Sequence, residues 1–154
     1  MNRLNFSWVI ADKLAGCAGP QDMVDLRFLK RKGITLIVRL AEEHKTHVSE
    51  DEVLKSGLKD FHEPIGDFTA PPQNQITRIV DHVRKSLEDG DVIAVSCGAG
   101  IGRTGMILAC ILISLNHSVE DALDIAERTR GHRAWETNEQ YQAILEYANT
   151  KKER

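Results

Sequence analysis

The stretch Val92–Gly105, VIAVSCGAGIGRTG, decides how this sequence folds. A continuous apolar run ends at Cys97, a loop made mostly of glycine follows, and an apolar, helix-like segment begins near Arg103. Glycine tolerates backbone angles that other residues avoid, and it lets a ligand approach the chain closely. The pattern predicts a buried strand, an anion-binding turn and a helix in direct succession.

Similar patterns on both sides of this stretch indicate the fold class. Besides 91–97, strand-like runs cover 6–10, 34–40 and 58–65. Apolar spacing and capping signals predict helices at about 20–32, after Ser49, and at 71–89, 103–116, 118–130 and 137–149. Because the continuous apolar runs are typical of strands buried on both faces, we expect an α/β fold: a mainly parallel central sheet flanked by helices on both faces.

Composition limits the organisation and the partners. At 154 residues, 42% hydrophobic and 28% charged, the chain suits one domain spanning 1–154. The net charge of −3 gives no reason to expect nucleic acid or a membrane surface as a partner. The first residues lack the pattern of a secretory signal, and no run is long enough to span a membrane. We therefore expect a soluble, cytoplasmic monomer.

The glycine loop resembles two nucleotide-binding patterns, but neither of them fits the sequence around it. Gly100, Gly102 and Gly105 satisfy G-x-G-x-x-G, but the segment that follows is helical where a dinucleotide fold needs a further strand. A phosphate-binding G-x-x-x-x-G-K-[ST] loop is not met either, because the spacing is one residue short and Arg103 stands in the lysine position. The loop is better suited to a small anion than to a nucleotide.

The residues of the loop point to a nucleophilic reaction on a phosphate. Gly98, Gly100 and Gly102 allow backbone N–H groups to surround an anion, and the start of the next helix adds positive potential there. The same surroundings favour a thiolate at Cys97. Arg103 supplies a planar fork that binds phosphoryl oxygens in pairs and stabilises charge in a transition state. This combination predicts a phosphatase site.

At this point the sequence resembles a known family. Cys97 to Arg103 matches the C-x5-R signature of the cysteine-dependent protein tyrosine phosphatases. The segments NFSWV, LAG, DFTAPP, GRTG, LAC and ETNEQ are similar to the small atypical dual-specificity phosphatases of the VH1-like Z type and their archaeal relatives, so the resemblance covers nearly the whole chain. It implies a dual-specificity-phosphatase-like fold, phosphorylated proteins or peptides as substrates, and a phosphocysteine intermediate formed without metal or other cofactor.

The resemblance also implies roles for individual residues. Cys97 corresponds to the nucleophile, Arg103 to a phosphate ligand, and Thr104 to a hydroxyl partner of the thiolate. The backbone amides that would bind phosphate belong to Gly98, Ala99, Gly100, Ile101 and Gly102. The loop contains no charged residue before Arg103, which argues against a phosphoinositide substrate. Phosphotyrosine is expected, with phosphoserine and phosphothreonine as further candidates.

A general acid is needed to protonate the leaving oxygen. Asp67, on the segment EPIGDFTAPP between a strand and a helix, is the candidate, and an Asp that bonds its own turn is the alternative. Glu63 is the fallback acid. Gln140 matches a position that places the hydrolytic water in relatives, although it also fits a capping box with Thr137.

Several residues depart from the family or carry weaker signals. Ser96 replaces the histidine that usually precedes the cysteine, which motivates an alternative: a catalytically weak phosphate-binding module that recognises phosphorylated partners. A solvated loop is the favoured interpretation of the residues Arg130, His132 and Arg133, and a second anion site is the alternative. His44 and His47 are expected on a surface loop and not at a metal. Cys17 and Cys110 are expected in the core.

Overall fold

A mainly parallel sheet forms the centre of the computed structural model, which describes residues 3–152. Its strands are β1 (Ser7–Ile10), β2 (Leu14–Ala18), β3 (Leu36–Arg39), β4 (Lys59–His62) and β5 (Ile93–Cys97). They are arranged in the order β1-β2-β5-β3-β4. Only the β1–β2 pair is antiparallel among the described strands; β2–β5, β5–β3 and β3–β4 are parallel. The expected sheet is confirmed.

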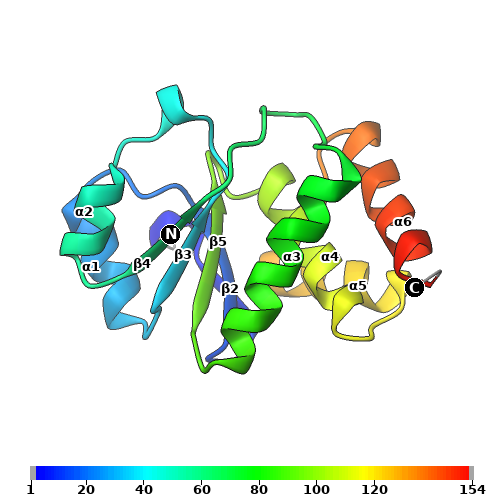
Figure 1. Cartoon of the computed structure of the whole chain (residues 1–154), viewed down its shortest axis with the longest axis horizontal. Coiled ribbons are helices and arrows are strands. Elements are labelled where there is room, and N and C mark those ends of the chain that lie inside the picture. Colours follow the sequence, from blue (N-terminus) through cyan, green and yellow to red (C-terminus); the bar gives the residue numbers. More distant parts are fainter. Residues whose placement is uncertain (1–2, 153–154) are drawn as a thin grey trace.

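Helices cover both faces of this sheet. They are α1 (Met23–Arg31), α2 (Glu50–Lys55), α3 (Gln73–Glu88), α4 (Gly102–Ser114), α5 (Val119–Arg130) and α6 (Asn138–Lys152), with short 3-10 turns at Arg3–Asn5 and Glu43–Lys45. Figure 1 shows α1 and α2 on one side of the sheet and α3 to α6 on the other. The predicted α/β fold class is therefore correct.

Local signals explain where most helices begin. The Ser49 hydroxyl accepts a bond from the Glu52 N–H, and the Glu52 carboxylate accepts one from the Ser49 N–H, which completes the predicted capping box. Ser118 caps α5 with one bond of this kind: its hydroxyl accepts a bond from the Asp121 N–H. The first helix begins later than the sequence predicts, because Asp22 and not the Gly19-Pro20 pair supplies the cap.

Strand β2 is the element that the sequence pattern did not predict. Its residues Leu14–Ala18 are short and mostly small, and alanine and glycine have low strand propensity. Tertiary packing requires a residue without a side chain at Gly16, because a Cβ there would lie 2.8 Å from a Leu108 methyl group and 2.9 Å from the Arg130 Nε. The strand forms because its neighbours β1 and β5 both pair with it.

Two apolar layers hold the sheet in place. One, on the α1 and α2 side, includes Cys17; the other packs α3 to α6 against the sheet and includes Cys110. Every residue of α4 is buried, so this helix runs through the centre of the second layer. No helix within residues 3–152 is long and apolar enough to cross a membrane.

Candidate active site

The loop between β5 and α4 lies at the carboxyl ends of the parallel strands. Cys97 is the last residue of β5, only 3% exposed, and α4 begins at Gly102. Gly100 has a φ of +80°, and a Cβ there would lie about 2.5 Å from the Cys17 backbone, so only glycine fits. The predicted strand, tight loop and helix are all present, and the N-terminus of α4 adds positive potential beside Cys97.

Hydrogen bonds behind the loop turn its carbonyl groups outward. The Gly98 carbonyl accepts a bond from the Gly19 N–H at 3.0 Å, and the Gly100 carbonyl accepts one from the Arg130 Nη2 at 2.6 Å. In a trans peptide the carbonyl and the following N–H point in opposite directions. The N–H groups of Ala99 and Ile101 therefore face the interior of the loop, as an anion-binding nest requires.

Arg130 is a buried structural residue and not part of a solvated loop. It is 6% exposed, and its Nη1 also donates to the Asn5 carbonyl, the Ser7 hydroxyl and the Gly16 carbonyl. Burial lowers the pKa of its guanidinium. Neither sequence interpretation of Arg130 was right, because the tertiary fold brings the end of α5 against β1, β2 and the loop.

Arg103 is held in front of the loop by acceptors from two other segments. Its Nη1 donates to the Glu42 carboxylate and to the Ile65 carbonyl, both at 2.8 Å, and its Nη2 lies 3.4 Å from the Asp67 carboxylate. Its Nε is buried and has no partner within the described chain. The side chain is thus positioned while one N–H in the guanidinium plane stays available to a ligand.

Thr104 follows Arg103 in the first turn of α4. Its side chain is fully buried, and its hydroxyl has no hydrogen-bond partner among residues 3–152. A buried hydroxyl without a partner is uncommon in native proteins and calls for an explanation. A bond to the thiolate of Cys97 would supply the missing partner.

Asp67 lies on a loop that is closed over the site. Its carboxylate accepts a bond from the Phe68 N–H at 3.0 Å, so the turn-forming role is present together with the contact to Arg103. The start of α6 holds this loop in place: the Thr137 hydroxyl donates to the Phe68 carbonyl, and the Glu139 carboxylate accepts from the Ala70 N–H. The carboxyl is 35% exposed and remains accessible to solvent.

Gln140 is completely buried where the start of α6 meets the loop that carries Asp67. Its carbonyl oxygen accepts bonds from the Glu136 and Thr137 N–H groups, and its Nε2 donates to the Thr69 carbonyl at 3.4 Å. The Thr137 hydroxyl in turn accepts from the Gln140 N–H, which completes the predicted capping box. Gln140 joins the helix start to the loop that carries Asp67.

Two acidic residues of the site were missed from the sequence. Glu42 follows β3, and Glu136 precedes α6, where its carboxylate accepts a bond from the Gly102 N–H at 3.0 Å. Gly102 is one of the amides expected to bind phosphate, so a phosphoryl oxygen would share or replace that contact. Glu42 had a usable signal, because the carboxyl end of a buried parallel strand is where ligand-binding residues gather. The Glu136 contact depends on how α6 packs.

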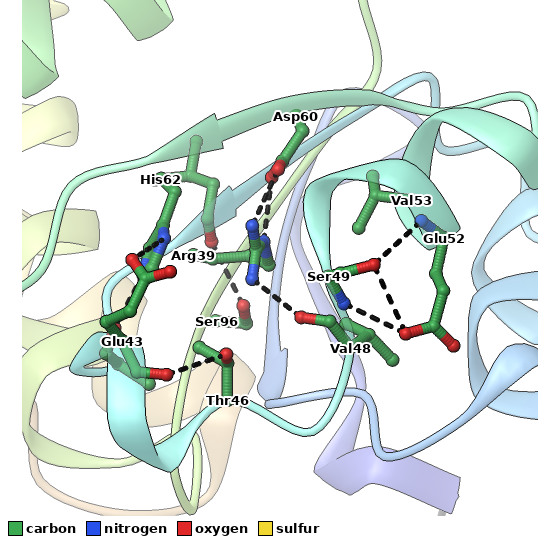
Figure 2. A network of polar contacts seen from close by, with 12 residues as sticks. Arg39, Glu43, Thr46, Val48, Ser49, Glu52, Val53, Asp60, His62 and Ser96 are labelled. Atoms are coloured by element: carbon green, nitrogen blue, oxygen red, sulfur yellow. Dashed lines mark hydrogen bonds and ion pairs between the residues drawn. The ribbon is translucent and has the colours of Figure 1, made fainter.

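Glu63 and Ser96 are occupied elsewhere. Glu63 makes a bidentate ion pair with Arg78, whose hydrogen bonds and charge lower the pKa of its carboxyl. It is therefore part of a surface ion pair and not a general acid. The Ser96 hydroxyl donates to the Val38 carbonyl at 3.0 Å and does not contact the loop (Figure 2).

The other predicted residues lie at the edges of the site or outside it. Burial raises the pKa of the Cys17 thiol to about 12 and also raises that of Cys110, which confirms both as core residues. His44 and His47 are exposed, and no cluster of three or more metal-ligating side chains occurs within the described residues.

Two hollows flank the loop. One, of about 230 Å³, is bordered by Cys97, Gly98 and residues from the β2–α1 and β3–α2 connections. The other is wider, about 560 Å³, and lies between Phe68, Ile101 and the segment 132–136. His132 and Arg133 line this second hollow. A ligand bound at Cys97 would therefore have two places for its neighbouring groups.

The chain is similar to known phosphatases. Residues 16–117 match the family described as "Polymorphic toxin system, DSP-PTPase phosphatase". The uncharacterized protein MJECL20 of Methanocaldococcus jannaschii is 36% identical over 84 residues, 54% of this chain and 56% of that protein. The mouse protein tyrosine phosphatase type IVA 2 is 34% identical over 107 residues, 67% of this chain and 62% of that protein. The aligned part thus spans little more than half of these relatives.

The fold comparison covers nearly the whole chain. The crystal structure of Tk-PTP in the active form has a TM-score of 0.87 with this structure and 27% sequence identity, and the match covers 96% of this chain and 99% of that one. The fold that the glycine loop predicts is thus the fold of a solved phosphatase.

Proposed function

The chain belongs to the DSP-PTPase phosphatase family, and from that premise we propose that it hydrolyses phosphotyrosine, and also phosphoserine or phosphothreonine, in proteins or peptides. The observation that carries the proposal is the buried, unpartnered Nε of Arg103 beside the loop that begins at Cys97. A phosphoryl group there would receive this N–H together with the inward-facing amides of Ala99 and Ile101. No neutral ligand uses such a set of donors as fully as a phosphate does.

The first chemical step transfers the phosphoryl group to the enzyme. The Cys97 thiolate attacks phosphorus, the S–P bond forms, and the P–O bond to the tyrosine oxygen breaks. Asp67 gives its proton to the departing oxygen, so that a neutral phenol leaves. Arg103 and the loop amides stabilise the charge that builds up on the phosphoryl oxygens.

The second step releases phosphate. A water molecule attacks phosphorus, Asp67 accepts a proton from that water, and the S–P bond breaks to restore the thiolate. Thr104 donates its free hydroxyl to the sulfur, which stabilises the thiolate as a leaving group. Gln140 acts as a positioning residue by holding the loop that carries Asp67 against α6.

No step of this mechanism draws on a metal or another cofactor. We further propose that the chain works as a monomer in the cytoplasm, where reducing conditions keep Cys97 as a free thiol.

The experiment compares hydrolysis of a phosphotyrosine peptide by the wild type, Cys97→Ser and Asp67→Asn, across pH and with a chelator present. We expect turnover that survives chelation and is abolished by Cys97→Ser. Asp67→Asn should lower kcat by roughly 10²- to 10⁴-fold and remove the limb of the pH profile that needs a protonated acid. Glu63→Gln is the matched control, because it removes a carboxylate on the same segment that faces Arg78.

The alternative is a phosphate-binding module without useful catalysis. It is suggested by Ser96, which stands where the family usually has a histidine before the cysteine. It predicts no turnover by the wild type together with peptide binding that is lost in Arg103→Ala. Turnover that is sensitive to Cys97 contradicts the alternative. Absence of both turnover and binding contradicts both proposals.

A further inference from the structure

The smaller hollow beside Cys97 has an unusual lining for a chain with a net charge of −3. Three basic side chains border it, those of Arg39, Lys45 and His47, and none of the lining residues in the described part of the chain is acidic. Its volume of about 230 Å³ is several times the roughly 30 Å³ that one water occupies in the liquid. That is room for a phosphoryl or carboxylate group and part of the side chain that carries it.

The walls of the hollow are fixed before any ligand binds. The Arg39 guanidinium, on β3, is bound by both carboxylate oxygens of Asp60 at 2.7 and 2.6 Å and donates to the Val48 carbonyl at 3.1 Å. Figure 2 shows this side chain joining Asp60 to the segment that contains Thr46 and Val48. Because these contacts anchor the β3–α2 connection, little ordering is needed when a ligand enters.

Arg39 and Lys45 keep charged donors that a ligand can use. The Ser96 hydroxyl donates to the Val38 carbonyl and the Thr46 hydroxyl to the Glu43 carbonyl, so both protons are used. Arg39 uses three of the five N–H donors that a guanidinium carries, which leaves two. Lys45 is half exposed and lies 3.7 Å from the Glu42 carboxylate, which is a loose ion pair. Such donors favour an anion over a neutral or cationic group.

The hollow is adjacent to the reacting phosphate without being part of its binding loop. Cys97 and Gly98 border it, whereas Arg103 and Asp67 do not. Successive residues of an extended peptide are about 3.3–3.6 Å apart. The side chain next to the phosphorylated residue can therefore enter a hollow that begins at Cys97. The wider hollow on the other flank differs, because its two basic side chains, His132 and Arg133, share it with the Glu136 carboxylate and with the apolar rings of Phe68 and Trp135.

We propose that the hollow formed by Arg39, Lys45 and His47 binds a second anionic side chain of a peptide substrate, next to the phosphorylated residue that Cys97 attacks. The inference rests on the proposed phosphatase function and specifies its substrates: peptides with a phosphorylated or acidic neighbour are preferred. Peptides are favoured over lipid headgroups because the apolar flank with Phe68 and Trp135 gives the rest of a peptide chain a surface to contact.

The test compares phosphotyrosine peptides that differ only in the adjacent residue: alanine, glutamate, phosphoserine or lysine, placed on either side. We expect kcat/KM for the phosphoserine peptide to exceed that for the alanine peptide by about tenfold, as one charge-assisted hydrogen bond provides. Glutamate should lie between them, and lysine should be the poorest. The preference should decline with added salt, because the Debye length is about 10 Å at 0.1 M.

Substitutions in the hollow test whether its side chains cause the preference for peptides with an anionic neighbouring residue. Lys45→Met should reduce the phosphoserine-to-alanine ratio to about threefold, and combining it with His47→Gln should reduce the ratio further, with Arg39 supplying what remains. Lys55→Met is the matched control, because Lys55 is an exposed lysine on α2 that pairs with Asp51 and does not border the hollow. A ratio between two peptides cancels any change in the basal rate. An unchanged ratio in the Lys45 variants would overturn the proposal.

Failure of this inference is distinguishable from failure of the proposed function. Equal hydrolysis of all peptides overturns the second-anion site and leaves the phosphatase activity intact. If no peptide is hydrolysed, calorimetric binding of the same peptides to Cys97→Ser decides the question, since the preference must then appear in Kd. Faster hydrolysis of an inositol bisphosphate than of every peptide, sensitive to Lys45, would overturn the assignment to a peptide.

Discussion

Two buried arginines, Arg103 and Arg130, flank the loop from opposite sides, and their partners differ in kind. In front, Arg103 is 2% exposed and held by the carboxylates of Glu42 and Asp67 and one carbonyl. Behind, Arg130 is 6% exposed and held by three carbonyls of the Asn5, Gly16 and Gly100 backbone and by the Ser7 hydroxyl.

This difference is what we expect between an arginine that is proposed to bind a ligand, Arg103, and a structural one, Arg130. Acidic side chains can move aside for a phosphate, whose oxygens offer Arg103 the same kind of charged acceptor. Backbone carbonyls cannot move without distorting β2 and the loop, so Arg130 is fixed. Burial of a charge is costly in both places, but only at Arg103 would the proposed phosphorylated substrate help to balance it.

The largest effect on catalysis is expected from Arg103→Ala. It removes the fork that we propose binds the phosphoryl oxygens, so kcat/KM should fall by roughly 10³-fold. Steady-state kinetics on a phosphotyrosine peptide checks this, with circular dichroism to confirm the fold. A loss smaller than about threefold would mean that the loop amides alone bind the phosphate.

Arg130→Met should act mainly on stability. The substitution leaves buried carbonyls without a donor, which should cost about 3 kcal/mol and lower Tm by about 10 °C. Thermal unfolding measures the change, and Arg133→Met, on an exposed neighbour, is the control. A large loss of kcat with an unchanged Tm would contradict the structural role and make the two arginines alike.

Glu42→Ala tests how the front arginine is positioned. Without its carboxylate partner Arg103 loses its fixed orientation, and kcat/KM should fall by about tenfold, whereas Glu42→Gln keeps an acceptor and should lose less. Partial burial opposes ionisation of Glu42, but its own backbone N–H, Lys45 and Arg103 outweigh this and lower the pKa of the carboxyl. Its charge is therefore present throughout the neutral range, and the defect should be the same from pH 6 to 8.

Glu63→Gln should have the smallest effect. Arg78 lowers the pKa of Glu63, so the ionised pair contributes stability above the ordinary carboxyl pKa of about 4.3, and that contribution is lost as the pH falls through the lower folded value. As a surface pair it should contribute less than about 1 kcal/mol at pH 7. Urea unfolding of both proteins at pH 7 and pH 3 checks this, with a smaller difference at the lower pH. A matching loss of kcat would restore Glu63 as a candidate acid.

Much of the site followed from local sequence. The apolar run before Cys97, the glycines after it and the helix signal beyond are all short-range features, and each produces its structure with little help from distant residues. The same holds for the capping boxes at Ser49 and Thr137, where side chain and backbone are three residues apart.

The features that the sequence analysis did not predict depend on contacts between distant parts of the chain. The strand at Leu14–Ala18 has weak local propensity and exists because two neighbouring strands pair with it. Glu136 carries no distinguishing pattern in the sequence, and Glu42 carries only its place after a buried strand; their contacts to Gly102 and Arg103 span 34 and 61 residues. Charged residues in loops look alike in one dimension, so only the fold decides which of them meet.

The sequence by itself determined the fold class, the loop that begins at Cys97 and the identity of Arg103 and Asp67 as candidates, since these depend on residue types at short, fixed spacing. The tertiary structure decided which carboxylate faces Arg103, why Glu63 is not available, and that Arg130 supports the loop from behind. It also placed Arg39, Lys45 and His47 around one hollow beside Cys97. These are contacts between segments far apart in the chain, and packing of the whole domain is what brings them together.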